Sequence, residues 1–167
     1  MSGSALASGI STGMSLTEEA TARSLILGLI HRYASVARED RDPGQLTELF
    51  EPGGIVKFPD GRELEPSRLD EITSTNPPKL LRHHVTTVDI QFISPDEAYC
   101  QSYVIAGTHL KLPDHWGRWD DVVKRQSNGR WLFKKKVIVV DGLDPNGWLI
   151  TVLSPAEDTQ SDTDNKY

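Results

Sequence analysis

Two adjacent histidines, His83 and His84, stand near the start of a run rich in Val, Thr and Ile. Such runs are typical of β-strands, and successive side chains on a strand point to opposite faces. One of the two histidines is therefore expected to face the interior and the other to face solvent. An imidazole in an apolar interior can transfer protons near neutral pH. The alternative is that the inward histidine is an ordinary hydrogen-bonded core residue.

Two further stretches carry polar side chains that could serve the same chemistry. In residues 117–121, strand alternation places Trp119 and Asp121 on one face, where Asp121 could position a substrate or pair with Lys135. A surface charge ladder is the alternative interpretation. Residues 109–115 interrupt the strands, so His109 or His115 could reach into a pocket from a loop, or the loop could be a plain connection. No metal-ligand spacing is present, so no metal is expected.

Length and composition limit the function classes. The chain has 167 residues, which predicts one domain with a sizeable core. The net charge of −6 argues against a nucleic-acid or anionic-membrane partner. The single cysteine, Cys100, excludes an internal disulfide framework and a cysteine-based zinc site. No apolar run is long enough to span a bilayer, and the default expectation is a cytoplasmic protein.

The elements that must position these residues follow an α+β order, with helices first and long strands after. Residues 16–150 are expected to fold, between flexible segments at 1–15 and 151–167. A helix capped by Thr17 is expected to carry an apolar stripe that includes Tyr33. The economical arrangement is a strongly curved antiparallel sheet around the N-terminal helices, which forms a cone with an internal pocket. Further helices are expected at 45–50 and 66–73, and strands at 55–58, 81–93, 97–107, 116–126 and 130–140.

The order of motifs resembles a known family. The ordered pieces are Tyr33–Asp42, Leu49-Phe50, Arg82–Val88, Gly117–Asp121 and Asn128–Trp131. Together they resemble the SnoaL-like, scytalone dehydratase-like branch of the nuclear-transport-factor-2-like (cystatin-like cone) superfamily. The superfamily hosts many reactions as well as binding domains, so the resemblance bears on the fold more than on the reaction.

The resemblance implies a proton relay without metal or cofactor, between a carboxylate at the end of the first helix and a strand histidine. The histidine matches His83. Counting back from Leu49-Phe50 gives Glu39 as the carboxylate, whereas helical periodicity from Tyr33 favours Asp40. Departures from the family pattern are Thr87, where relatives often carry asparagine, and the run of residues 134–136, Lys-Lys-Lys, where they often carry arginine.

The expected function is that of a lyase or isomerase, a dehydratase or cyclase, acting on a small apolar, polyketide- or terpenoid-like substrate. An enolate-like intermediate needs a hydrogen-bond donor at its oxygen, for which Tyr33, Tyr103 and Trp116 are candidates, with Trp119 and Asp121 as further substrate contacts. Each aromatic residue could equally be a core residue. The alternative function is a non-catalytic binding or oligomerisation domain. The resemblance also implies a homodimer or homotrimer.

Overall fold

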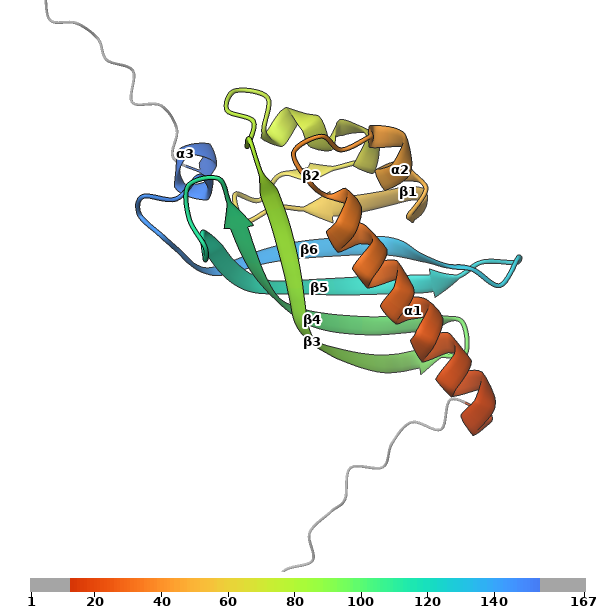
Figure 1. The fold of residues 1–167 in the computed structure, drawn as a ribbon. Helices are drawn as coiled ribbons and strands as arrows, with labels where there is room; N and C mark the ends of the chain where they lie inside the picture. Colours follow the sequence, from red (N-terminus) through yellow and green to blue (C-terminus); the bar gives the residue numbers. More distant parts are fainter. Residues whose placement is uncertain (1–12, 154–167) are drawn as a thin grey trace, which may run out of the picture.

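The computed structural model describes residues 13–153 and has the predicted α+β order (Figure 1). The predicted flexible segments lie outside the described residues, apart from 13–15 and 151–153. The helices are α1 (Leu16–Val36), α2 (Pro43–Thr47), the 3-10 helix η1 (Pro66–Ile72) and α3 (Leu149–Leu153). The strands are β1 (Phe50–Lys57), β2 (Glu63–Leu64), β3 (Leu81–Ser94), β4 (Glu97–Thr108), β5 (His115–Arg125) and β6 (Trp131–Leu143).

Helix α1 begins at a capping box. The Ser15 side chain accepts a hydrogen bond from the Glu18 backbone, and the Glu18 carboxylate accepts one from the Ser15 amide at 2.8 Å. The cap is therefore Ser15, and the prediction of Thr17 was wrong by two residues because Ser15 has a carboxylate three positions later. The buried stripe of α1 has a helical period and faces the sheet, along Ala22, Ile26, Leu29, Ile30, Tyr33 and Val36 (Figure 1).

The sheet has six strands in the order β2-β1-β6-β5-β4-β3. All neighbours are antiparallel except β1 and β6, which are parallel. The sheet curves around α1 without closing (Figure 1). The pairing of β5 with β6 shifts register between Trp116 and Gly117, where a Cβ on Gly117 would lie 2.0 Å from the Val139 carbonyl oxygen. Only glycine fits this bulge, which bends the sheet beside the pocket.

Two elements differ from the sequence prediction in ways that matter for the site. The predicted helix at 45–50 is α2, which ends at Thr47, and Phe50 already belongs to β1. Helix α3 was not predicted, and the expected domain boundary at residue 150 falls inside it. Five residues are too few to show helical periodicity. Trp148, just before α3, is 4% exposed and packs with Leu81 and Ala106.

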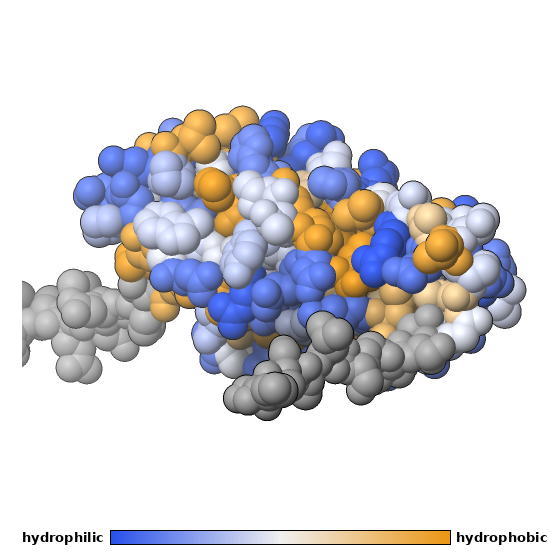
Figure 2. Space-filling model, turned by 90° about the horizontal axis from the view of Figure 1, so that it is seen from below, coloured by the Kyte–Doolittle hydropathy of each residue, from blue (hydrophilic) through white to orange (hydrophobic). Residues whose placement is uncertain are grey.

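Several large apolar side chains remain on the surface. Tyr103 and Ile105 of β4 and Trp116 of β5 are each at least 40% exposed, and Ile105 pairs with Trp116 across the two strands. Figure 2 shows apolar side chains in patches among hydrophilic ones on one face of the molecule. A homodimer or homotrimer remains a prediction. No helix among residues 13–153 is long and apolar enough to cross a membrane.

Candidate active site

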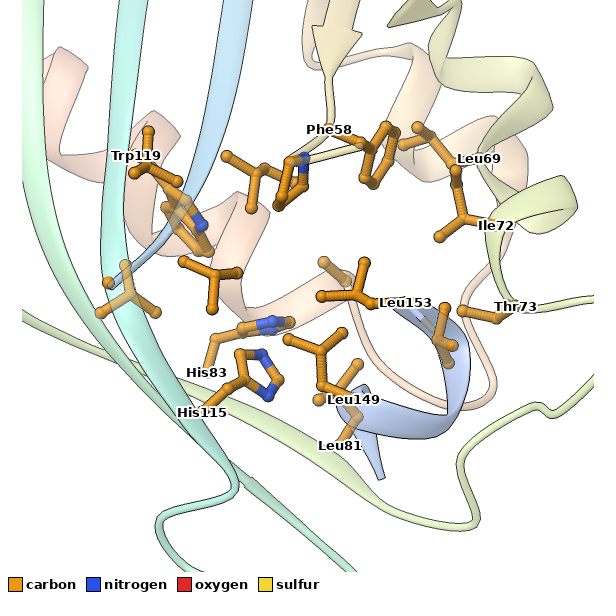
Figure 3. A pocket seen from close by; sticks show the side chains of 18 of the residues that line it. Phe58, Leu69, Ile72, Thr73, Leu81, His83, His115, Trp119, Leu149 and Leu153 are labelled. Carbon is orange, nitrogen blue, oxygen red and sulfur yellow. The ribbon is translucent and has the colours of Figure 1, made fainter. Parts of the chain in front are cut away.

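A mainly apolar pocket lies between the curved sheet, η1 and α3 (Figure 3). Its volume is about 130 Å³. Figure 3 shows His83 and His115 at one end of the pocket, with Phe58 and Leu69 at the opposite end and Leu149 and Leu153 along one side. A cavity of this size is close to one that holds a benzene ring. The pocket therefore fits a ligand about as large as one six-membered ring.

His83 lies in the pocket, whereas His84 is exposed. The His83 ring centroid is 5.5 Å from that of Trp119 and 6.2 Å from that of His115. Its Nδ1 is buried and has no hydrogen-bond partner among the described residues. Burial lowers the pKa of His83 to about 3, assisted by the neighbouring His115 and opposed by a hydrogen bond with the backbone of Ala37. The imidazole is therefore neutral at pH 7.

The structure does not bring Glu39 or Asp40 to His83. Glu39 accepts hydrogen bonds from the Leu81 amide at 3.0 Å and from Arg82, which lowers the pKa of Glu39 to about 2. Asp40 pairs with Arg38 at 2.7 Å on the surface. Neither carboxylate is within hydrogen-bond distance of the ring. The physical reason is that α1 ends at Val36, so the helical period from Tyr33 does not extend to residues 39 and 40.

A carboxylate–histidine pair is present, but it is formed by Asp114 and His115. The distance from His115 Nδ1 to Asp114 Oδ1 is 2.8 Å. Asp114 is fully buried, and the His115 side chain is 14% exposed. Burial lowers the pKa of His115, while the hydrogen bond to Asp114 opposes that shift. The sequence shows Asp114 directly before His115 at the start of a strand. Strand alternation alone would place the two side chains on opposite faces, so it does not predict this pair.

A second buried pair lies against Tyr33 and Trp119, two aromatic residues that line the pocket. Lys136 Nζ is 2.7 Å from Asp121 Oδ2, and both side chains are fully buried. The ammonium also lies 4.2–4.4 Å from the ring centroids of Tyr33, Trp119 and Phe133. Burial raises the pKa of Asp121 to about 6, against the effect of Lys136, and lowers that of Lys136, against the effect of Asp121. Lys136 therefore contacts the ring faces of two residues that line the pocket, Tyr33 and Trp119.

The pairing of Asp121 with Lys135 was a wrong prediction. Its partner is Lys136, and Lys135 instead lies 3.5 Å from Glu63. The strand register decides this, because Asp121 is directly opposite Lys136, whereas Lys135 is opposite Val122. Asp121 does not line the pocket, so its predicted contact with substrate would have to be indirect.

The predicted aromatic residues fall into two groups. Tyr33 and Trp119 are buried and line the pocket, and Trp116 borders it while its ring packs over Gly142. Tyr103 is 49% exposed and lies outside the pocket, because its neighbours in β4 face inward. Burial raises the pKa of Tyr33, so its hydroxyl stays protonated and can donate a hydrogen bond.

No metal centre is evident in the part of the chain that the structure describes, since no group of three or more His, Cys, Asp or Glu side chains is arranged to hold an ion. Cys100 is buried, and burial raises its pKa to about 12, so the thiol stays protonated. Besides its histidines, the pocket is lined by the polar side chains of Arg41, Asp60 and Thr73.

An α+β cone with a pocket between its helices and the concave sheet defines the class of protein. Residues 18–137 match the family model of the SnoaL-like domain, and the chain belongs to that family. No curated protein sequence matches the chain.

Solved structures share the fold at low identity. A putative scytalone dehydratase from Novosphingobium aromaticivorans is 20% identical, with a TM-score of 0.67 over 78% of this chain and 91% of that chain. Hexachlorocyclohexane dehydrochlorinase LinA-type3 from Novosphingobium barchaimii is 14% identical, with a TM-score of 0.66 over 78% and 93%. A protein of unknown function with a cystatin-like fold from Nostoc punctiforme is 21% identical, with a TM-score of 0.64 over 78% and 96%.

Proposed function

We propose that the protein is a cofactor-independent lyase or isomerase that moves a proton on a small, uncharged, apolar molecule. The observation that carries the proposal is the pair of neutral imidazoles, His83 and His115, at one end of an otherwise mainly apolar pocket. A neutral imidazole can accept a proton from carbon, and an apolar wall favours an uncharged ligand. Two structural neighbours are named as a dehydratase and a dehydrochlorinase, and both names denote eliminations.

The substrate class follows from the size and polarity of the pocket. A volume of about 130 Å³ suits one ring of a terpenoid- or polyketide-like molecule. Removal of a proton beside a carbonyl produces an enolate-like oxygen, which needs a donor in a site that excludes water. Tyr33 lines the pocket with a protonated hydroxyl that bonds to no other described residue, so we assign it that role. The proposed reaction is elimination of water beside a ring carbonyl, or the related double-bond shift.

The proposal is tested with 3-hydroxycyclohexanone and cyclohexanone in D₂O. A base that removes the C2 proton of the hydroxyketone, with loss of the C3 hydroxyl as water, gives 2-cyclohexenone. Deuterium at C2 reports proton removal even where no water is lost. We expect the protein to accelerate exchange, and His83→Ala/His115→Ala to lose about 10²-fold of that rate or more.

The matched control is His84→Ala/His109→Ala, which removes two exposed imidazoles. We expect this variant to exchange at the wild-type rate. Equal loss in both double variants, or no wild-type rate above buffer for either ketone, contradicts the proposal. Saturable binding of the ketones without exchange favours the alternative, a small-molecule-binding domain of the same fold.

A further inference from the structure

The hydrogen bond between Asp114 and His115 occupies Nδ1 of the His115 ring and leaves the other ring nitrogen, Nε2, for a ligand. We infer that Nε2 of His115 is the atom that takes the proton, and that Asp114 is the residue that positions it. This inference rests on the proposed function and names the base within it. It differs from the sequence prediction, in which His83 is the base and a carboxylate after α1 orients it.

Asp114 accepts hydrogen bonds from four donors. Its Oδ2 accepts hydrogen bonds from Thr108 Oγ1 at 2.8 Å and from the Trp148 amide, and its Oδ1 accepts one from the Leu149 amide at 3.2 Å. With His115 Nδ1, four donors surround a fully buried carboxylate. These bonds fix the orientation of the carboxylate, and the carboxylate fixes the orientation of the imidazole that it contacts.

The contact determines the tautomer of His115. The hydrogen bonds to Asp114 lower its pKa despite its burial, so Asp114 is ionised at pH 7. An ionised carboxylate only accepts hydrogen bonds, so Nδ1 of His115 must carry the hydrogen. Nε2 then holds a lone pair, and it makes no hydrogen bond to another described residue. An imidazolium formed at Nε2 would be stabilised by the adjacent negative charge, as in other carboxylate–histidine pairs.

His83 is less suited to the same step. Its Nδ1 is buried and has no hydrogen-bond partner among the described residues, so no contact at Nδ1 fixes which nitrogen of this ring carries the hydrogen. Among residues 13–153, no carboxylate forms a hydrogen bond or an ion pair with His83 that could stabilise an imidazolium. The His83 and His115 ring centroids are 6.2 Å apart, so His83 can flank a ligand whose proton moves to His115.

Asp114 also connects the base to the wall of the pocket. Asp114 accepts hydrogen bonds from the backbone amides of Trp148, just before α3, and Leu149, the first residue of α3. Leu149 and Leu153 of this helix line the pocket. Gly147 permits this approach, since a Cβ there would lie 2.7 Å from Asp114 Oδ2. The same carboxylate therefore orients His115 and bonds to the first residue of the helix that lines one side of the pocket.

The single variants of the two histidines separate the roles. In the cyclohexanone exchange assay, we expect His115→Ala to lose about 10²-fold in rate and His83→Ala to lose less than about tenfold. The reverse order, or equal losses, overturns the inference while leaving the proposed function standing. Circular dichroism of each variant verifies that it is folded.

Asp114→Asn tests positioning rather than contact with substrate. Loss of the charge beside His115 should lower its basicity, so the acidic limb of the rate–pH profile should move to lower pH and the plateau should fall at least about tenfold. Thr108→Val removes another bond to the same carboxylate and should leave the limb in place. A fall in rate with an unmoved limb in Asp114→Asn means a structural role only, and overturns the positioning claim.

The protonation of the two His115 nitrogens can also be measured without any reaction, and so does not depend on the proposed function. Nitrogen-15 NMR of the full chain at pH 7 distinguishes a protonated from a bare ring nitrogen. We expect a bare Nε2 and a protonated Nδ1 on His115, and loss of that preference in Asp114→Asn. A protonated Nε2 on wild-type His115 overturns the inference whatever the ketone assay shows.

Discussion

Removing either member of the buried Asp121–Lys136 pair is expected to lower the free energy of unfolding by about 3–5 kcal/mol. Both side chains are fully buried and 2.7 Å apart, so the remaining side chain loses its only ion-pair partner among the described residues and must either stay charged without a counter-ion or become neutral at a cost in free energy. Lys136→Ala also removes the cation from the faces of Tyr33, Trp119 and Phe133. Urea unfolding of Asp121→Ala and Lys136→Ala measures these losses.

Lys134→Ala is the matched control for this prediction. Lys134 is on the same strand and has an acidic partner, Glu97 at 3.4 Å, but its side chain is 48% exposed. Exposed pairs of this kind contribute at most about 1 kcal/mol. Losses of similar size at Lys134 and Lys136 would show that burial of the pair does not govern its contribution.

Acid is expected to destabilise the protein through His83. The ring has a pKa of about 3 in the folded chain, against 6.5 ordinarily. Between pH 6.5 and pH 3 the histidine therefore binds a proton in the unfolded chain but not in the folded chain. The free energy of unfolding falls progressively over this range as the pH is lowered. The contribution of His83 to this loss between pH 7 and pH 4 should be about 3 kcal/mol.

The His83 contribution must be isolated by difference. Asp121, whose pKa is raised to about 6 by burial, acts in the opposite direction between pH 6 and 3.8, because the folded chain binds that proton more readily. We expect unfolding of His83→Gln to depend less on pH than unfolding of wild type, and His84→Gln to retain the wild-type dependence. A wild-type slope in His83→Gln would contradict the burial of a neutral imidazole.

The elements that a periodic pattern specifies were predictable from the sequence. The stripe of α1 and the four long strands need only local alternation, and they place Tyr33, His83 and Trp119 around one pocket. The family resemblance predicted that the sheet is strongly curved, and the fold confirms this prediction.

Contacts between elements distant in sequence were not predictable. Two carboxylates were predicted as the partner, Glu39 by counting back from Leu49-Phe50 and Asp40 by continuing the period of α1. The helix stops at Val36, and Glu39 bonds to Leu81 and Arg82 instead. Lys136 rather than Lys135 meets Asp121 because of a register that only the paired strands reveal. Asp114 accepts hydrogen bonds from the amides of Trp148 and Leu149. These two residues lie close to residues 151–167, which the sequence predicted to be a flexible tail.

Histidine NMR titration of wild type tests the central claim most directly, which is that the pocket holds two neutral imidazoles. The His83 and His115 signals are assigned with His83→Gln and His115→Gln and followed from pH 7.5 downward. We predict that the pKa of each ring lies below the ordinary value of 6.5, and that His83 stays neutral to the lowest pH at which the protein is folded. A pKa of 6.5 or above for either ring in the folded protein would contradict the account.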